Sequence, residues 1–487
     1  MPDVVVIGAG MGGLAAAARL AAKGLAVTVV EALHEPGGKA GTVVIDGVRC
    51  DTGPSVVTMP DVVEQLFADC GRPNPVRLRT LEPAFRYRWP DGVALDVHHA
   101  PDDTVASVRR TLGSKPADEL EQFLGYAKTI WELAGPAFVR GPSPGIGTFF
   151  RMGLGRLLEL PKLDTHRSMQ AAVHRMVAEP HLRDLLLRYA TYNGSDPRVA
   201  PATLNCIASV ELEGGCFGVE GGLGQLARDL EDLGRGLGVT FRYGERVLGL
   251  DMDRGRVAAV RTDRDTIEAC TVVSNADVAH LAKLVPAVKP PSLGPSTSGW
   301  TALLQVPRRS LEARAPHEVL FPARYDREFV DLFDGPRAPT DPTAYTCAQD
   351  RAHGVGTWPG PDPSAPELEP LFVMANAPST KDAAHDAELG ERTLARLDGL
   401  GLIDGATLRW ERHPRDLAEV FPDTHGALYG VASNSRFAAF LRPANRVRAV
   451  PGLYLASGSA HPGGGVPLCL LSGRQAALQV LADRGDP

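Results

Sequence analysis

Six residues near the start of the chain have the types and spacing needed to bind a pyrophosphate. Gly8-Ala9-Gly10-Met11-Gly12-Gly13 follows the apolar run Val4 to Ile7, which is typical of a buried parallel strand. In such a turn Gly8 permits the tight bend, Gly10 lets a pyrophosphate approach the backbone, and Gly13 allows a helix to pack closely on the strand. The helix that follows would present unpaired N–H groups and its positive dipole end.

A carboxylate lies where a ribose hydroxyl would be bound. Leu14 to Lys23 is Ala-rich and predicts a helix, Ala26 to Val30 predicts a second strand, and Glu31 ends that strand. Together these segments form a β-α-β unit of about 30 residues. A glycine turn without a ligand is the alternative, but the strand, helix and acid together favour a dinucleotide site.

The segment after Glu31, with Gly37-Gly38-Lys39, resembles that of the FAD-binding amine-oxidase and phytoene-desaturase group, which implies FAD rather than a nicotinamide cofactor. Gly38, in Gly37-Gly38-Lys39, suits a second close approach of backbone to cofactor, and Lys39 could meet a phosphate. No second Gly-x-Gly-x-x-Gly follows a later strand. A separate nicotinamide domain is therefore not expected, and the reduced flavin needs another electron acceptor, oxygen or a quinone.

A second glycine-rich turn lies near the other end of the sequence. Gly458 and Gly463-Gly464-Gly465 precede Val466-Pro467, where a helix is predicted to begin. A helix aimed at the flavin pyrimidine ring would stabilise negative charge there, whereas an ordinary capped surface helix is the alternative. His461, in the same turn, is the candidate catalytic residue, as a hydrogen-bonding or proton-accepting group at the flavin. A turn histidine bonded to backbone is its alternative.

Composition narrows the class of protein. The 487 residues carry 51 Lys and Arg against 58 Asp and Glu, a net charge of −7, so a generally basic nucleic-acid binder is not expected. The seven scattered cysteines form no zinc or disulfide pattern, and the histidines lack metal-ligand spacing, so no metal is predicted. The uncharged stretch Val4 to Ala18 is shorter than the roughly 18 residues that span a bilayer.

The remaining patterns place the other elements. Residues 114–200 repeat apolar side chains at helical spacing, and residues 239–277 predict short strands bounded by turns. Residues 285–345 and 355–368 are rich in Pro and Gly and predict irregular strands and long loops. A strand at Leu453 to Ala456 precedes the second glycine-rich turn.

The sequence resembles the bacterial carotenoid desaturases of the phytoene-desaturase family, nearly end to end. The matching stretches include Val6 to Gly13, Gly37-Gly38-Lys39, Asp51-Thr52-Gly53-Pro54-Ser55, Gly218 to Leu223, Ser274-Asn275-Ala276-Asp277, Phe440-Leu441-Arg442-Pro443 and Gly452 to Gly473. Three segments are most similar to the hydroxycarotenoid 3,4-desaturases: Gly53 to Met59, Trp89-Pro90-Asp91-Gly92 and Phe421 to Gly430.

This resemblance implies an α/β fold with two parts. A discontinuous Rossmann-like FAD domain, of the glutathione-reductase-2 or amine-oxidase type, would comprise residues 1–75, 205–285 and 425–487. A substrate domain would combine a mixed sheet from 76–113 and 286–424 with helices from 114–204. Gly53, Pro54 and Ser55 would also contact FAD, and Val247 would touch its adenine side through the backbone.

The resemblance also implies an activity. The chain would desaturate an acyclic polyene by passing a hydride to flavin N5 and losing a proton, with C3–C4 of 1-hydroxylated carotenoids as the expected position. Alternatives are a phytoene desaturase, a carotenoid cis–trans isomerase and a prenyl-binding protein without enzymatic activity. Tyr192-Asn193-Gly194 could line the substrate route, with a plain turn as the alternative, and Arg415-Asp416 is either part of a family-like motif or a structural ion pair.

A membrane-bound substrate implies a location. Family members are peripheral on membranes, so a cytoplasmic protein on the inner face of the cell membrane is expected. Phe149 to Leu160, with Arg151 and Arg156, is the candidate membrane-facing helix, and a helix packed on the protein core is the alternative.

Overall fold

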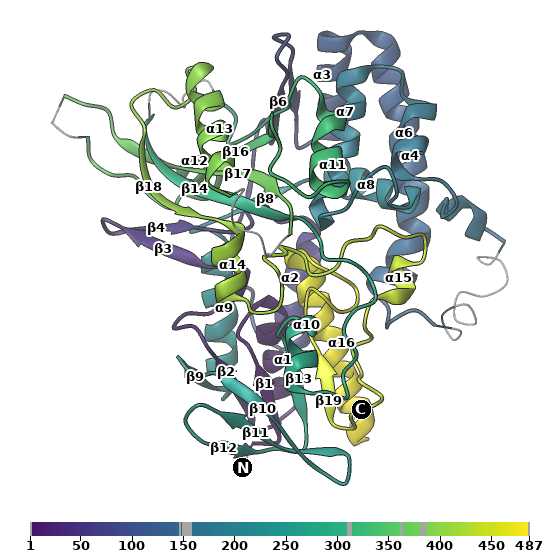
Figure 1. Ribbon diagram of the computed structural model, residues 1–487, viewed down its shortest axis with the longest axis vertical. Coiled ribbons are helices and arrows are strands. Elements are labelled where there is room, and N and C mark those ends of the chain that lie inside the picture. Colours follow the sequence, from purple (N-terminus) through teal and green to yellow (C-terminus); the bar gives the residue numbers. More distant parts are fainter. Residues whose placement is uncertain are drawn as a thin grey trace.

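A five-stranded parallel sheet forms the lower half of the molecule (Figure 1). Its order is β19-β13-β1-β2-β9, so three distant stretches of chain build one sheet. The strands are β1 (Val4–Ile7), β2 (Val27–Glu31), β9 (Thr240–Tyr243), β13 (Val272–Ser274) and β19 (Leu453–Leu455). The computed structural model describes residues 2–145, 148, 158–308, 314–360, 364–379 and 386–485.

Both faces of this sheet are covered, which explains why β1 is apolar throughout. Val4 and Val6 pack with the helical layer, and Val5 and Ile7 pack with an antiparallel three-stranded sheet. The helices are α1 (Met11–Ala22), α2 (Pro60–Asp69), α9 (Leu223–Gly236) and α16 (Val466–Arg484). The three strands are β10 (Val247–Asp253), β11 (Arg256–Thr262) and β12 (Thr266–Glu268).

Helices α1 and α16 lie so close together that only glycine fits between them. A Cβ on Gly473 would lie 2.3 Å from the carbonyl oxygen of Gly12. A Cβ on Gly13 would lie 2.1 Å from the carbonyl oxygen of Gly8, so the turn after β1 packs tightly on its own helix. These approaches bring the N-termini of two helices from opposite ends of the sequence to one place.

A seven-stranded mixed sheet forms the second layer, with order β18-β14-β17-β16-β15-β6-β7. Within this sheet β6 and β15 pair in parallel, and the other pairs seen in the described residues are antiparallel. The strands are β6 (Phe85–Arg88), β7 (Ala94–Val97), β14 (Ser298–Pro307), β15 (His317–Leu320), β16 (Ala344–Ala348), β17 (Leu368–Ala377) and β18 (Thr407–Arg412).

The prediction of irregular strands and long loops over 285–345 is wrong. That stretch contains the ten-residue strand β14, which pairs with β17 in unbroken register, and the helix α11 (Tyr325–Phe333). Trp300 and Leu304 pack in one apolar cluster, whereas Leu303 packs in another. Because both faces of β14 are buried, its sequence lacks the alternation that marks a half-exposed strand.

Helices occupy the upper right of the molecule (Figure 1). They are α3 (Pro101–Leu112), α4 (Ser114–Ala134), α6 (Met169–Met176), α7 (Pro180–Arg188) and α8 (Cys206–Leu212), with the 3-10 helix η4 (Tyr189–Asn193) directly after α7. Most of the candidate membrane-facing helix, residues 149–157, lies outside the described residues. In the ranges that the structure describes, no helix has the length and apolar character to cross a bilayer.

The remaining named strands and helices join or flank these layers. They are β3 (Thr42–Ile45), β4 (Val48–Asp51), β5 (Leu78–Thr80), β8 (Phe217–Val219), α10 (Val278–Leu284), α12 (Gln349–His353), α13 (Asp386–Gly399), α14 (Pro414–Val420) and α15 (Ala438–Leu441). Asp51, at the end of β4, accepts hydrogen bonds from the Leu223 and Gly224 N–H groups and so caps α9.

Candidate active site

A cavity of about 320 Å³ lies at the carboxyl ends of β1 and β2, where ligands bind in open α/β sheets. Most of the residues expected to bind FAD line it: Gly8, Gly10, Glu31, Gly38, Lys39, Gly53, Pro54, Val247, Gly458, Gly465 and Val466. Ser55 and Pro467 line a second, adjoining cavity instead, and Gly13 and His461 are not among the lining residues of either.

Two helix N-termini face the first cavity. Helix α1 begins after Gly10 and α16 begins after Gly465, and glycine offers no side chain to cap either helix. The first-turn N–H groups of both helices therefore remain available to a ligand, and both dipoles favour negative charge there. Met11, Gly12 and Val466 from these first turns line the cavity.

The cavity wall is tight where backbone must approach a ligand. A Cβ on Gly10 would lie 2.4 Å from the Asn275 side-chain oxygen, and a Cβ on Gly464 would lie 2.9 Å from Tyr429. The Asn275 side chain donates to the Ala456 carbonyl at 2.5 Å and so joins the ends of β13 and β19. These contacts fix the two glycine turns against each other.

Glu31 is buried beside the first turn. Its Oε2 accepts from the Ala9 N–H at 2.6 Å and its Oε1 accepts from the Leu33 N–H at 2.8 Å. Burial raises the pKa of Glu31, and the two backbone hydrogen bonds oppose that rise. Since a carboxylate has about four acceptor sites, positions remain for the hydroxyls of a ribose.

Lys39 is held mainly by the protein itself. Its Nζ donates to the carbonyls of Ala427 at 2.6 Å and Leu428 at 3.1 Å, and it lies 5.5 Å from the Phe421 ring centroid. Burial lowers the pKa of Lys39 below its ordinary value. Two of the three N–H donors of the Lys39 ammonium bind the carbonyls of Ala427 and Leu428, so Lys39 positions this part of the cavity wall. One N–H donor is left for the predicted phosphate.

The second cavity has a volume of about 580 Å³ and shares a wall with the first. The residues common to both are Gly53, Pro54, Phe372, Met374, Tyr429, Gly464, Gly465 and Val466. Its other walls are largely apolar, from residues such as Phe85, Trp131, Leu163 and Ile207. A flat ring in the first cavity would therefore lie against an elongated apolar guest in the second.

His461 does not have the placement expected of a catalytic residue. Its side chain is 1% exposed, and its Nε2 contacts the Gly141 carbonyl at 2.9 Å. Burial lowers the pKa of His461 to about 4. The structure thus favours the alternative of a turn histidine bonded to backbone, because the ring has no access to either cavity.

Other candidates are also resolved by the geometry. Tyr192 and Asn193 line the second cavity, so the plain-turn interpretation is incomplete, although Gly194, directly after η4, does have a left-handed conformation. Asp416 caps the start of α14 through the His413 N–H, as in a structural role.

Arg188 was not identified from the sequence, although it lines the second cavity and is 8% exposed. An arginine that directly follows Leu185-Leu186-Leu187 at the end of a buried helical face was the available signal.

Comparisons with known proteins agree with this geometry. The chain is 35% identical to the hydroxyneurosporene desaturase of Rhodobacter capsulatus over 99% of its length and 98% of that protein. It is 30% identical to the 1-hydroxycarotenoid 3,4-desaturase of a Flavobacterium species, covering 97% and 98%. The fold matches cyclohexylamine oxidase from Brevibacterium oxydans with a TM-score of 0.60 at 16% identity, over 99% of each chain.

These similarities confirm the predicted fold class and the predicted resemblance to carotenoid desaturases. The flavin containing amine oxidoreductase model matches residues 11–481, almost the whole of the sequence. The glycine-lined cavity, with two helix N-termini that face it, fits this match. The chain therefore belongs to the flavin-containing amine oxidoreductase family.

Proposed function

We propose that this chain is an FAD-dependent carotenoid desaturase that acts at C3–C4 of 1-hydroxylated acyclic carotenoids. The observation that carries the proposal is the wall shared by a dinucleotide-type cavity and a larger apolar cavity. The names of the relatives, hydroxyneurosporene desaturase and 1-hydroxycarotenoid 3,4-desaturase, support the same substrate class.

The residues of the first cavity fit FAD. Glycines whose Cβ atoms would meet backbone or Asn275, the Glu31 carboxylate and two uncapped helix N-termini are what a pyrophosphate, a ribose and a flavin ring require. We assign the pyrophosphate to Gly8–Gly13, the ribose to Glu31 and the adenine side to Val247. The flavin would lie against Gly458 and Gly465 to Pro467, and the FAD part of the chain would comprise 1–75, 205–285 and 425–487.

Desaturation needs alignment and exclusion of water more than a strong base. When bound, FAD supplies the acceptor for a hydride from the substrate. The shared wall of Phe372, Met374 and Tyr429 would hold a saturated C–C bond against the cofactor, and the apolar walls beyond would keep water away. The second hydrogen leaves as a proton from a carbon next to a delocalised cation, so no buried base is assigned.

The alternatives differ in products and cofactor. A phytoene desaturase would convert the hydrocarbon stepwise, an isomerase would leave the mass unchanged, and a prenyl-binding protein would purify without flavin. The polar groups in the second cavity, among them Arg188 and Tyr325, favour an oxygenated polyene over phytoene.

The test uses FAD-reconstituted protein with liposomes that contain phytoene and a 1-hydroxylated acyclic carotenoid. One new double bond in the hydroxylated carotenoid alone supports the proposal. Stepwise conversion of phytoene assigns a phytoene desaturase, and conversion of neither substrate by flavin-loaded protein rejects the carotenoid assignment. Repeating the assay without oxygen, with and without a quinone, identifies the electron acceptor.

We also propose that the protein binds peripherally to the inner face of the cell membrane. Phe437, Leu441 and Leu158 are 58%, 42% and 84% exposed, and neighbouring residues Arg436, Ala438 and Leu160 line the second cavity. An apolar surface at the cavity mouth would let a polyene pass directly from lipid.

Vesicle flotation tests this surface. The double variant Phe437→Ser with Leu441→Ser should lose most of its binding to liposomes. Leu400→Ser, which removes a 55% exposed leucine next to α13, is the matched control and should float like the wild type. Equal binding by all three proteins would reject the surface.

A further inference from the structure

Arg188 places a buried positive charge in the largely apolar second cavity, which Arg436 and Arg442 also line. It ends α7, is 8% exposed, and its guanidinium lies over the rings of Phe85, Tyr87 and Tyr192 at 5.4, 5.5 and 4.9 Å. Burying a cation is costly unless it is paired or hydrogen-bonded. A residue kept there at such cost needs a structural or a binding explanation.

The partners of Arg188 use only one of its nitrogens. Nη1 donates to the hydroxyls of Tyr87 at 3.1 Å and Tyr192 at 2.9 Å. The Tyr192 hydroxyl links Arg188 to the buried acid Glu211, since it donates to Glu211 at 2.5 Å. Tyr189 donates to the other Glu211 oxygen at 3.0 Å. Nε and Nη2 make no hydrogen bond with any residue in the described ranges, so their donors are available in the cavity.

Three further side chains that line the same cavity have a buried polar atom without a hydrogen-bond partner among the described residues: Tyr325, Asn193 and Arg442. The Tyr325 hydroxyl is buried, on a side chain that is 3% exposed, and the Asn193 Oδ1 is also buried. Burial raises the pKa of Tyr325 well above its ordinary value, and the charge of Arg188 opposes that rise. Unsatisfied buried polar atoms are rare in proteins and point to a missing partner.

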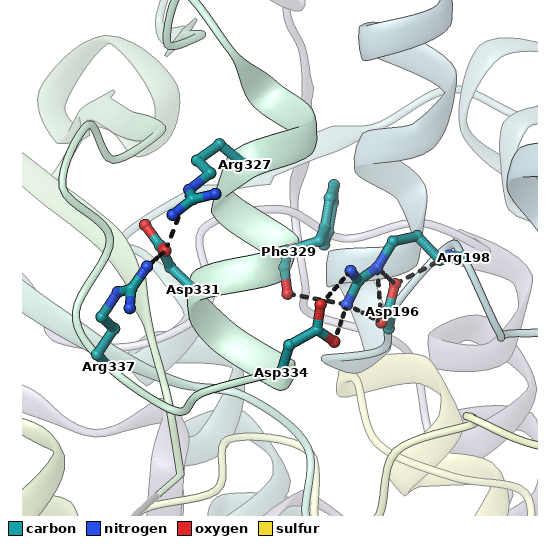
Figure 2. A network of polar contacts seen from close by, with 7 residues as sticks. All are labelled: Asp196, Arg198, Arg327, Phe329, Asp331, Asp334 and Arg337. Atoms are coloured by element: carbon teal, nitrogen blue, oxygen red, sulfur yellow. Dashed lines mark hydrogen bonds and ion pairs between the residues drawn. The ribbon is translucent and has the colours of Figure 1, made fainter.

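An ion-pair network joins the two segments of chain that carry Asn193 and Tyr325. Arg198, just after η4, donates to both oxygens of Asp334 at the end of α11 and to the Phe329 carbonyl within it (Figure 2). Tyr325 begins α11, and Asn193 ends η4. The network therefore connects the two elements that carry these two unpartnered groups.

We propose that Arg188, Tyr325 and Asn193 form the specificity site for a hydroxyl group on the polyene end. This inference rests on the proposed function. An alcohol oxygen would accept from the free Arg188 donors, and its proton would be donated to Tyr325 or Asn193. A hydrocarbon end satisfies none of these groups, and a site built to bind a hydroxyl discriminates strongly against the analogue that lacks it.

The test compares two substrates on each variant. A 1-hydroxylated acyclic carotenoid and the unhydroxylated hydrocarbon of equal chain length are assayed in liposomes with flavin-loaded protein. In Tyr325→Phe and Arg188→Lys, the ratio of kcat/KM for the hydroxylated to the unhydroxylated substrate should fall by about 10-fold or more. Tyr325→Phe removes one oxygen atom, so it keeps the test valid if Arg188→Lys folds poorly.

Tyr345→Phe is the matched control. Its hydroxyl lies in the same cavity but is already bonded to His317 at 2.8 Å, so its loss should change both substrates alike and leave the ratio unaltered. An unchanged ratio in both Tyr325→Phe and Arg188→Lys would overturn the inference.

Binding separates this inference from the proposed function. If wild-type protein desaturates neither substrate, absorbance titration of each polyene with flavin-loaded protein gives the ratio of Kd values instead. Preference for the hydroxylated polyene that is lost in Tyr325→Phe supports the site, and equal Kd values for wild type reject it. Flavin content, measured in every variant, reports on the first cavity alone.

Discussion

The guanidinium of Arg198 donates to both carboxylate oxygens of Asp334, each at 2.7 Å, and to Asp196 with its remaining edge (Figure 2). The two acids differ in environment, because the Asp196 side chain is 5% exposed and that of Asp334 is 55% exposed. One arginine thus joins a buried and a solvated carboxylate, on segments that border the second cavity.

This difference predicts unequal effects on stability. Arg198→Met leaves the buried Asp196 carboxylate without its cation and should lower the free energy of unfolding by about 2 kcal/mol. Asp334→Asn removes only a solvated partner and should have a much smaller effect. Denaturant unfolding of both variants measures the contrast, and equal losses would show that the exposed pair matters as much as the buried one.

Gly10→Ala should weaken flavin binding. The new Cβ would lie 2.4 Å from the Asn275 oxygen, so the turn or β13 must shift away from a cofactor that approaches the backbone. We expect affinity to fall by about 10-fold or more, which corresponds to about 1.4 kcal/mol, measured by flavin titration of apoprotein.

Gly125→Ala in α4 is the control, since its added Cβ would meet no atom of the described residues within 4 Å apart from its chain neighbours and the nearby backbone of its own helix. It should leave flavin affinity unchanged and add about 0.5–1 kcal/mol of stability. Equal flavin affinity in the two variants would remove the predicted role of Gly10.

His461→Gln should retain activity and change the pH dependence of stability. The pKa of His461 is about 4 in the folded protein and about 6.5 in an unfolded chain. The unfolded state therefore binds more protons between these values, and wild-type stability falls as pH drops from about 6.5 towards 4. Glutamine does not titrate, so stability relative to the variant should fall by up to about 3 kcal/mol across that window.

Thermal or denaturant unfolding at a series of pH values measures this difference. A neutral-pH loss of activity by about 100-fold or more would instead restore His461 as a proton-transfer group.

Lys39→Met should loosen the loop that closes the first cavity. The carbonyls of Ala427 and Leu428 would lose their donor, at a cost of about 1–3 kcal/mol for an unsatisfied buried group. Hydrogen exchange of residues 424–430 should quicken and flavin affinity should fall. Lys289→Met, at an exposed position, is the control and should change neither property.

The sequence pattern was sufficient to predict those parts of the candidate site whose residues lie close together in the chain. The turn from Gly8 to Gly13 and the acid at Glu31 could be predicted because a tight turn, a helix start and a strand end are encoded within about 30 residues. The bounds of β1, β2 and β19 were also expected to within one residue, because each strand is short and mostly apolar.

Contacts between distant residues could not be predicted in the same way. Strand β14 is stabilised by ten residue pairings with β17, some 70 residues later in the chain. Its own sequence shows no clear alternation of apolar and polar residues. Arg188 depends on Glu211 through Tyr192, and Tyr325 reaches the same cavity from another layer. Such sites follow from how layers pack, which spacing along the chain does not encode.

The order of the sheet also has a consequence for biosynthesis. Strand β19 and helix α16 complete the cofactor cavity, yet the ribosome makes them more than 400 residues after β1 and α1. During translation the turn Gly8–Gly13 is made long before β19, which pairs with β13, and before α16, which packs on α1. We therefore expect the cofactor to bind stably only after residues 453–484 have been made, and chains that stop before them to remain flavin-free and sensitive to proteolysis.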